Sequence, residues 1–477
     1  MACLAGDVIL ARNANLPPKI FRVPDQQNRS VAIVGSGPGG MYVAQALLLK
    51  APGCRIDILD KLPTPFGLIR GGVAPDHQKT KRVDAKYAQS VTSDGVRFIG
   101  NVTVGRDVAI DELRAAYDAV VLAYGAPYDN TLGIPGEDKA GVIGSNAFVG
   151  WYNCHPEFRD LDPNLDVGGV VVIGIGNVAI DVARVLAKTP AEMAETDIAD
   201  YAERRIEASL IRDIWMFGRR GPVEAAFTNT ELKELGALAD CRTDVDPNQL
   251  PKEVPESFDD RIRKVKTRIL GTLWSLSEPS DGERRRNMHI RFFARPVEVL
   301  GGARVEGVRM EHTRVADGRT IGTGETFDIP CGLLLTCIGS RARAIEGAPF
   351  DEDRGVVVHT DGRVADGVYA AGWVKRGASG TIGTNKLDSD AVAELIVADF
   401  GADSDADSGG DPGGEAKPGP DGLDALLREH GTDPVTFDDW LVIKRLEEEA
   451  ATAGAPRRKF TTVKDMLESL ARERAGV

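Results

Sequence analysis

The stretch SVAIVGSGPGG, residues 30–40, contains three glycines spaced as Gly35-x-Gly37-x-x-Gly40. A β-branched run, Val31 to Val34, precedes them, and the helix-forming stretch MYVAQALLLK follows at once. A strand that enters a helix through these glycines is the fingerprint of a dinucleotide-binding domain. The first glycine permits the tight turn, the second lets a pyrophosphate approach the backbone, and the third lets helix and strand pack closely.

The residues that follow complete this unit. A second strand-like run, RIDILD, ends in Asp60, which lies 20 residues after Gly40. A carboxylate at this spacing accepts hydrogen bonds from the ribose hydroxyls of a bound dinucleotide. The pyrophosphate would lie at the helix N-terminus, where free N–H groups and the helix dipole favour an anion. The alternative is a helix that needs glycine only for packing.

The same pattern recurs in GGVVVIGIGNVAIDVARVLAK. Here the strand Val170–Ile173 enters Gly174-x-Gly176-x-x-Ala179 and then a helix. Val178, Val182, Val185 and Leu186 recur at helical spacing, so we expect them to form one apolar face against a sheet. The sequence therefore predicts two dinucleotide-binding units in one chain.

The second unit differs from the first in its charge. Its next strand follows a mostly helical insertion, residues 188–213, and reads DIWMFGRRGP, with Arg219 and Arg220 where an NAD site has an acid. A carboxylate would repel a 2′-phosphate, whereas guanidinium groups bind it bidentately. The pair favours NADP over NAD, although a solvated charge pair would read the same. Two nucleotide sites, one of them selective for NADP, indicate a flavin and pyridine-nucleotide oxidoreductase.

The overall composition excludes several other classes. The net charge of −14 argues against a nucleic-acid partner. No apolar run is long enough to span a bilayer, and the N-terminal segment has no basic region before its apolar patch, so we expect a cytoplasmic protein without an integral membrane segment. The six cysteines form no CxxC motif, which argues against a metal site, an iron–sulfur cluster or a disulfide framework. Cys331 and Cys337 are interpreted as packing residues on one face of a buried strand.

Four longer motifs carry a resemblance to a known family. They are LPTPFGLIRGGVAPDH, VVIGIGNVAIDVAR, GRRGPVEAAFTNTELKEL and AAGWVKRGASGTIGTNK. In this order they resemble the adrenodoxin reductase type of ferredoxin–NADP reductase, including its bacterial relatives, over residues 30–477. The resemblance implies an α/β fold with two Rossmann-like domains, in which the NADP domain is inserted into the FAD domain.

The resemblance also implies domain boundaries. The FAD domain would comprise residues 30–128 and 345–477, and the NADP domain residues 129–344. Residues 1–29 form an N-terminal arm without an assigned role. Residues 401–421, rich in Gly, Pro and Asp, are expected to form a solvated linker. Two helices are expected after this linker, the second beginning with a capping-box-like Thr462-x-x-Asp465. We expect them to pack back on the FAD domain, and a contact with a partner protein is the alternative.

The family's chemistry is hydride transfer from NADPH to flavin N5, followed by single-electron transfer to a ferredoxin such as one that supplies a cytochrome P450. His77 matches a histidine beside the flavin, and Glu231 and Glu234 match acids that orient the nicotinamide and its ribose. A buried histidine and an ordinary helix face are the alternatives. The FAD-binding positions implied are Gly35, Gly37, Gly40, Asp60, Leu68, Val104, Gly372, Trp373, Gly380, Thr381 and Ile382. The NADP-binding positions implied are Gly174, Gly176, Asn177, Val178, Arg219, Arg220 and Glu231.

An acidic ferredoxin would need a local basic patch on this acidic chain. The stretch RIRKVKTR supplies Arg261, Arg263, Lys264 and Lys266 without an intervening acid. GERRR (residues 282–286) and KTKR (residues 79–82) are further candidates, and solvated helix faces would look the same.

Other oxidoreductases and one non-enzymatic role are the competing interpretations. A thioredoxin reductase needs a dithiol, and the electron-input subunit of a glutamate synthase needs cysteine clusters. A flavin monooxygenase shares only the two glycine fingerprints. A catalytically idle NADP-binding or redox-sensing flavoprotein would share the motifs without the turnover.

Overall fold

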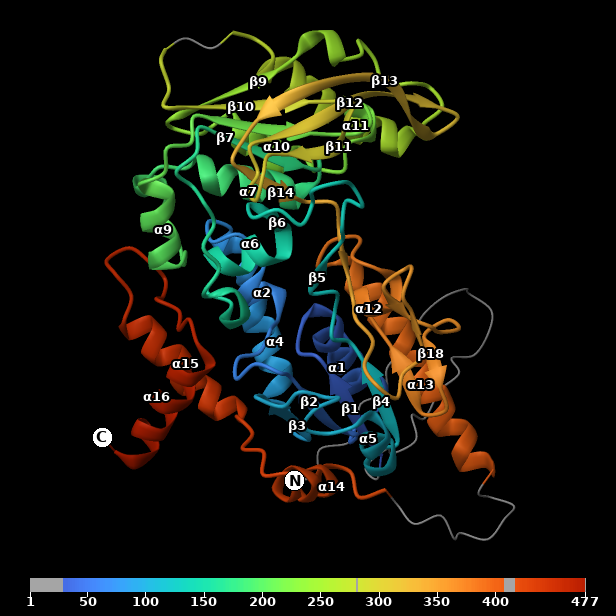
Figure 1. Ribbon diagram of the computed structural model, residues 1–477. Helices are drawn as coiled ribbons and strands as arrows, with labels where there is room; N and C mark the ends of the chain where they lie inside the picture. Colours follow the sequence, from blue (N-terminus) through green and yellow to red (C-terminus); the bar gives the residue numbers. More distant parts are fainter. Residues whose placement is uncertain (1–28, 280–281, 407–416, 477) are drawn as a thin grey trace, which may run out of the picture.

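The computed structural model describes residues 29–279, 282–406 and 417–476, so nearly all of the predicted N-terminal arm lies outside the described residues. Figure 1 shows two lobes, each built around its own six-stranded sheet. The first sheet lies in the lower lobe of this view and the second in the upper lobe. No helix within the described ranges is long and apolar enough to cross a membrane.

The first sheet is parallel except at one edge, where β18 runs antiparallel to β19. Its central strands are buried on both faces, which explains their continuous β-branched and apolar sequences. Helix α1 packs against α13 on one of these faces. In spatial order the strands are β18 (Arg363–Ala365), β19 (Val368–Ala370), β4 (Ala119–Leu122), β1 (Ser30–Val34), β2 (Arg55–Leu59) and β3 (Val96–Ile99). The helices of this lobe include α1 (Pro38–Lys50), α2 (Leu68–Gly71), α3 (Gln78–Lys81), α4 (Val83–Val91), α5 (Ile110–Ala116), α12 (Trp373–Arg376) and α13 (Thr384–Ala406).

The second sheet is parallel throughout. Its strands are β6 (Val142–Gly144), β14 (Leu333–Thr336), β7 (Gly169–Ile173), β8 (Asp213–Phe217), β10 (Arg286–Arg291) and β9 (Cys241–Val245). One face is covered by helices, and the other packs against the antiparallel sheet β11 (Ala294–Leu300), β12 (Gly307–Ala316) and β13 (Arg319–Pro330). The helices are α6 (Ser145–Tyr152), α7 (Asn177–Ala187), α8 (Pro190–Met193), α9 (Asp200–Glu207), α10 (Asn229–Leu235) and α11 (Asp260–Leu276).

The chain passes twice between the two sheets, and the two passages lie side by side. Strand β5 (Tyr128–Asp129) leaves the first sheet and β15 (Ser340–Arg341) returns toward it. The two strands pair antiparallel, with Tyr128 opposite Arg341. The chain of the second lobe is therefore inserted into the chain of the first lobe, and the paired strands β5 and β15 connect the two lobes.

The C-terminal region differs from the prediction of one linker and two helices. Helix α13 continues through Ala406, and α14 (Pro420–Glu429) begins inside the predicted linker. Two further helices follow, α15 (Phe437–Glu449) and α16 (Val463–Ala475), so three helices rather than two come after the linker. The cap at Thr462 is confirmed, because its hydroxyl oxygen accepts a hydrogen bond from the Asp465 N–H at 3.0 Å. Buried residues of α15 and α16 join the core of the first lobe.

Two packing predictions are wrong in detail. Val178 is 45% exposed, because it lies in the first turn of α7 beyond the sheet, whereas Val182, Val185 and Leu186 are buried. Cys331 and Cys337 flank β14 and pack into different cores, on opposite faces of the second sheet. All five cysteines within the described ranges are unpaired.

Candidate functional site

The first glycine loop has the geometry that its sequence predicts. Gly35 adopts φ +110°, and a Cβ there would lie 2.6 Å from the Ala123 carbonyl oxygen. A Cβ at Gly40 would lie 2.0 Å from the Gly35 carbonyl oxygen, so α1 closes directly on the turn. At Gly37, by contrast, a Cβ would meet nothing within 4 Å. The space beside Gly37 is therefore open, and it lies at the N-terminus of α1, which has no side-chain cap. An open space at free helix N–H groups fits a pyrophosphate.

Asp60 and Ser36 connect this loop to the ribbon TPFGLIRGGVAPDH, residues 64–77. The Asp60 carboxylate accepts hydrogen bonds from the Ser36 N–H at 3.1 Å, from the Ser36 hydroxyl, and from the Leu62 N–H at 3.0 Å. The Ser36 hydroxyl oxygen in turn accepts the Phe66 N–H at 3.1 Å. Burial raises the pKa of Asp60 above its ordinary value, while these donors act in the opposite direction. A carboxylate offers about four lone-pair positions, so Asp60 retains capacity for a ribose hydroxyl.

The ribbon passes directly beside the first glycine loop. Gly67 has φ +47°, and a Cβ there would lie 2.9 Å from the Cα of Gly37. Leu68, the first residue of α2, is 41% exposed, whereas Val104 is buried in the core beneath the first sheet. Glycine at position 67 is thus required both by its backbone conformation and by the close approach of the two chains.

The C-terminal motif AAGWVKRGASGTIGTNK returns to the same loop. A Cβ on Gly372 would lie 3.4 Å from the Cα of Gly39, so the two backbones are in contact. Trp373 begins α12 and donates its indole N–H to the Ser379 carbonyl oxygen at 3.2 Å. Gly380, Thr381 and Ile382 form the approach to α13, where the Thr381 N–H donates to the Thr384 hydroxyl at 3.1 Å.

The second glycine loop repeats the construction on the second sheet. A Cβ on Gly174 would lie 2.3 Å from the Cys337 carbonyl oxygen, whereas one on Gly176 would meet nothing within 4 Å. Helix α7 also lacks a side-chain cap, because its N-cap residue is Gly176. The side chain of Asn177, its first residue, accepts the Thr228 N–H at 2.8 Å. The free N–H groups of α7 and the open space beside Gly176 fit a second pyrophosphate.

The two arginines lie at the end of the strand beside this loop. Gly218 at the end of β8 contacts Ile175 of the loop, since a Cβ there would lie 2.3 Å from its Cδ1. Arg219 and Arg220 follow immediately and are exposed. Among the described residues neither guanidinium has an ion-pair partner, so both are available to a phosphate.

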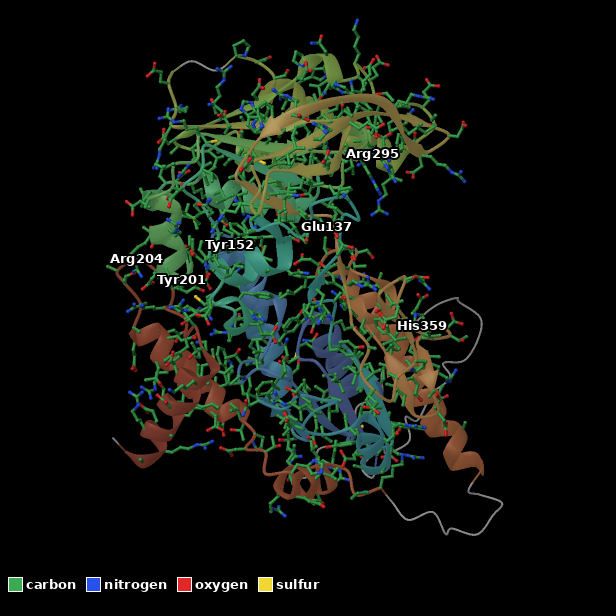
Figure 2. The ribbon with its side chains drawn as sticks, viewed as in Figure 1. Glu137, Tyr152, Tyr201, Arg204, Arg295 and His359 are labelled. Carbon is green, nitrogen blue, oxygen red and sulfur yellow. The ribbon has the colours of Figure 1, made fainter. Side chains whose placement is uncertain are left out.

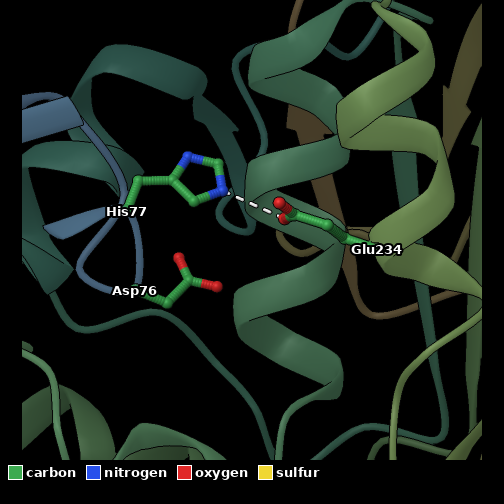
Figure 3. A group of neighbouring side chains, drawn as sticks. All are labelled: Asp76, His77 and Glu234. Carbon is green, nitrogen blue, oxygen red and sulfur yellow. Dashed lines mark hydrogen bonds and ion pairs between the residues drawn. The ribbon is translucent and has the colours of Figure 1, made fainter. Parts of the chain in front are cut away.

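The third element of the site lies at the seam, the boundary where the two lobes meet. His77, at the end of the ribbon, faces α7 and α10 of the upper lobe. Its Nε2 lies 3.0 Å from Glu234 Oε2 and 3.5 Å from Glu231 Oε2, and its Nδ1 lies 3.8 Å from Asp181 Oδ1. Figure 3 shows the imidazole directed at the Glu234 carboxylate across the seam, with Asp76 beside it.

A buried arginine holds this seam together. The Arg184 side chain is 0% exposed, and its guanidinium lies 2.8 Å from Asp76, 2.8 Å from Asp181, 3.3 Å from Glu231 and 2.9 Å from Glu234. Burial alone would raise the pKa of Asp76, but hydrogen bonds from Arg184 and Lys188 hold it well below its ordinary value. Burial raises the pKa of Asp181 to about 6.

Four residues of this cluster were not predicted from the sequence. The ion pairs of the cluster involve, besides the predicted residues, the side chains of Asp76, Asp181, Arg184 and Lys188. A signal was present, because AIDVAR places an acid and a base three residues apart in an otherwise apolar helix. Triads of these histidine and carboxylate side chains come close enough together to hold a metal ion. The Arg184 cation already occupies the centre of the carboxylates, and the absence of a metal stays a prediction.

This chain is similar to known proteins in both sequence and structure. The Pyridine nucleotide-disulphide oxidoreductase family model matches residues 29–211. The human mitochondrial NADPH:adrenodoxin oxidoreductase is 40% identical over 470 residues, covering 93% of this chain and 92% of the human protein. The Mycobacterium tuberculosis NADPH-ferredoxin reductase FprA is 38% identical over 456 residues, covering 92% of this chain and 98% of FprA. The structure of FprA in complex with NADPH superposes with a TM-score of 0.87 at 36% identity, covering 93% of this chain and 99% of that one.

Proposed function

This chain belongs to the family of the NADPH:adrenodoxin oxidoreductases and the bacterial ferredoxin–NADP reductases, and from that premise we propose that it oxidises NADPH and reduces a ferredoxin through bound FAD. The observation that carries the proposal is the seam contact. His77 of the lobe with the first glycine loop meets Glu234 of the lobe with the second loop at 3.0 Å. Two nucleotides held by the two loops would therefore meet beside an ordered pair of polar side chains.

The proposed domains follow the two sheets. Residues 30–128 and 345–477 would bind FAD, and residues 129–344 would bind NADP. The paired strands β5 and β15 at the two crossings support these boundaries. The cytoplasmic location predicted from the sequence stays a prediction.

FAD would lie along the first loop. Gly35, Gly37 and Gly40 would receive its pyrophosphate, and Asp60 its ribose. The chemistry that FAD supplies when bound is the conversion of a two-electron hydride into single electrons for a one-electron carrier. Other residues assigned to the flavin are Leu68, Val104, Gly372, Trp373, Gly380, Thr381 and Ile382. The contact between Gly372 and Gly39 supports a role for the C-terminal motif at the same site.

NADPH would lie along the second loop. Gly174, Gly176, Asn177 and Val178 would receive its pyrophosphate. Val178 is exposed at the first turn of α7, which supports a ligand contact better than a core position. Arg219 and Arg220 would bind the 2′-phosphate.

His77, Glu231 and Glu234 would align the nicotinamide rather than exchange a proton with it. Hydride transfer needs no general base, so their work is orientation and charge. The Arg184 guanidinium on α7 pairs with both glutamates, and the His77 imidazole contacts both from the other lobe. Preorganised groups of this kind lower the barrier by holding reactants in a reactive geometry.

The test of the function is anaerobic addition of NADPH to the purified holoenzyme. Prompt loss of flavin absorbance, followed by reduction of cytochrome c only when a ferredoxin is added, is the expected result. A flavin that stays oxidised would contradict the proposal and leave an idle nucleotide-binding flavoprotein. A panel of ferredoxins in the coupled assay would then identify the acceptor.

Replacing His77 by alanine should slow flavin reduction without releasing FAD. The change removes the contact with Glu234 while leaving the glycine loop and Asp60 intact. We expect the limiting rate of reduction by NADPH to fall about 10- to 100-fold, because misplacement of reacting groups by about 1 Å has effects of this size. Stopped-flow absorbance measures the rate, and the flavin-to-protein ratio is the control. An unchanged rate would make His77 a purely structural residue.

Docking of ferredoxin is proposed on α11, with a narrower set of residues than the sequence indicates. Arg261, Lys264 and Arg268 are exposed and share one face at helical spacing. Arg263 instead pairs with Asp260, and the Lys266 ammonium donates to the Ala225 carbonyl oxygen.

Burial also removes one basic side chain from each of the two other candidate docking stretches, KTKR (residues 79–82) and GERRR (residues 282–286). Lys81 of the KTKR stretch is 3% exposed, and Arg286 of the GERRR stretch is 2% exposed. The Arg286 guanidinium donates to the Ile206 carbonyl oxygen at 3.1 Å and to the Ser209 hydroxyl at 2.9 Å. Neither side chain is free to meet an acidic partner.

Reversing charge on α11 should weaken ferredoxin docking selectively. The variant Arg261→Glu/Lys264→Glu should raise KM for ferredoxin about tenfold at low salt, because close charge pairs at interfaces contribute of the order of 1.5 kcal/mol or more. The difference should shrink as salt is added. NADPH–ferricyanide activity should stay at the wild-type level, and Lys464→Glu on α16, which is 80% exposed, is the matched control. Equal loss of both activities would overturn this docking surface.

A further inference from the structure

The short helix that follows His77 is tied to the opposite lobe by a second group of charges, away from the nicotinamide site. Helix α3 begins after His77, whose carbonyl oxygen accepts the N–H groups of Thr80 and Lys81. The Lys81 ammonium donates to Asp197 at 2.6 Å, and the Gln78 side chain donates to the same Asp197 oxygen at 3.0 Å. Asp197 lies between α8 and α9 in the inserted region of the upper lobe.

This group is as buried as a protein core. Lys81 and Asp197 are each 3% exposed, and Lys459 of the segment between α15 and α16 is 5% exposed. The Lys459 ammonium lies 3.4 Å from the second Asp197 oxygen. Burial and the neighbouring Lys459 ammonium lower the pKa of Lys81 to about 7. Figure 1 shows the loop that carries Lys459 reaching up beside α9.

Asp197 itself is held by rigid neighbours. Helix α9 follows it directly, and the Tyr201 hydroxyl on that helix donates to the Trp151 carbonyl oxygen of α6 at 2.7 Å. Figure 2 labels Tyr201 on α9, beside the loop from the C-terminal region. The Ala199 N–H donates to the Tyr152 carbonyl oxygen at 3.0 Å. A shift at Lys81 would therefore be resisted by the fold of the upper lobe rather than absorbed by a mobile loop.

Three consecutive residues thus cross the seam to three different parts of the upper lobe. Asp76 reaches Arg184 on α7, His77 reaches Glu234 on α10, and Gln78 reaches Asp197 beyond α8. Lys81 repeats the last of these contacts one helical turn later. An imidazole fixed on both sides in this way has little freedom to turn away from the nicotinamide site.

We propose that the Lys81–Asp197 ion pair is a positioning element for hydride transfer, acting through helix α3 on His77. This inference rests on the proposed function and names two residues outside the positions assigned to either nucleotide. Lys459 has a different role in it. It completes the charge around Asp197 from the C-terminal segment, and its polar partners among the described residues are Asp197, Asn153 and the Arg70 carbonyl oxygen, none of them on α3.

Two matched variants separate positioning from plain stability. Lys81→Met and Lys459→Met make the same chemical change beside the same aspartate, and each leaves one lysine paired with Asp197. Only Lys81→Met removes the charged tie between α3 and the upper lobe, and it leaves the Gln78 hydrogen bond to Asp197 in place. The limiting rate of flavin reduction by NADPH should fall at least about tenfold in Lys81→Met, because small misplacements of reacting groups have effects of this size. In Lys459→Met the rate should stay within about twofold of wild type, since His77 keeps its anchor.

The measurement is anaerobic stopped-flow reduction of the full-length holoenzyme over a range of NADPH concentrations. In Lys81→Met the dissociation constant for NADPH should stay within about twofold, since this residue lies outside the binding loops. A primary deuterium isotope effect with 4-deuterated NADPH should persist, which identifies the slowed step as hydride transfer. Reduction by dithionite should be complete in both variants.

Equal slowing in the two methionine variants, or slowing in neither, would overturn the inference. If Lys81→Met does not retain FAD, Gln78→Ala replaces it, because this change removes the hydrogen bonds of a neutral side chain to Asp197 and to the Pro75 carbonyl oxygen and leaves the ion pair intact. That variant should slow reduction about two- to fivefold, and an unchanged rate would also count against the inference. A wild-type enzyme that NADPH does not reduce would contradict the proposed function instead, so the two failures are distinguishable.

Discussion

Replacing Arg219 and Arg220 together by alanine should weaken NADPH binding about 100-fold and leave NADH binding nearly unchanged. A hydrogen bond to a charged group contributes about 1.5 to 3 kcal/mol. Both side chains are exposed, so the lower figure applies to each, which gives about 3 kcal/mol or about 100-fold for the pair. The NADH molecule has no 2′-phosphate, and it loses nothing when the guanidinium groups are removed.

The measurement is the dissociation constant and KM for the two nucleotides, determined by titration and by ferricyanide reduction. The matched control is Arg212→Ala. Arg212 is exposed just before β8, and its backbone N–H donates to the Gly168 carbonyl oxygen at 2.9 Å, a bond that the substitution preserves. That variant should keep the wild-type preference for NADPH. A double variant that still discriminates between NADPH and NADH as the wild type does would assign the 2′-phosphate to other residues.

Replacing Arg184 by methionine should destabilise the protein more than any other single change at the seam. Methionine keeps the length of the side chain but leaves Asp76, Asp181, Glu231 and Glu234 without their shared cation. Removing one partner of a buried ion pair is destabilising by about 3 to 5 kcal/mol. The matched control is Arg204→Met on α9, which is exposed (Figure 2) and should change the free energy of unfolding by less than about 0.5 kcal/mol.

The sign of the pH dependence distinguishes this effect from simple loss of packing. Without the guanidinium, the folded-state pKa of Asp181 moves further above its unfolded value and that of Asp76 moves upward, because burial raises both and Arg184 no longer opposes it. The folded variant then binds more protons than the unfolded chain, so its stability increases as the pH falls from 8 toward 5. In the wild type, the pKa of Asp76 is lowered, and its contribution is present throughout this window and lost only at lower pH. Asp181, with a pKa of about 6, makes the wild type gain a little as the pH falls, and the variant should gain clearly more.

Thermal unfolding of the holoenzyme at pH 5.5, 7 and 8 measures both effects. A loss below about 1 kcal/mol at pH 8 would mean that the carboxylates are neutralised in another way. Equal losses at all three pH values would assign the effect to packing alone.

The sequence by itself determined the parts of the site that are built from neighbours along the chain. Each unit is a strand, a turn and a helix that follow one another within residues 30–50 or 169–187, and its requirements appear directly as Gly35, Gly37 and Gly40 or as Gly174 and Gly176. The charge at the end of the second unit is local too, since Arg219 follows its strand after one glycine. The cap at Thr462 belongs to the same class.

Only the tertiary structure decided the contacts between distant segments. Arg184 and Asp76 are 108 positions apart, and Lys81 and Asp197 are 116 apart, so no local pattern relates them. Whether a charged side chain is buried was likewise decided by the tertiary structure, and not by the basic motif that contains it. The sequence does not distinguish Lys81 and Arg286, which are buried, from Lys264, which is free. The free energy of a charge depends on its partners and its access to water, and folding alone supplies both.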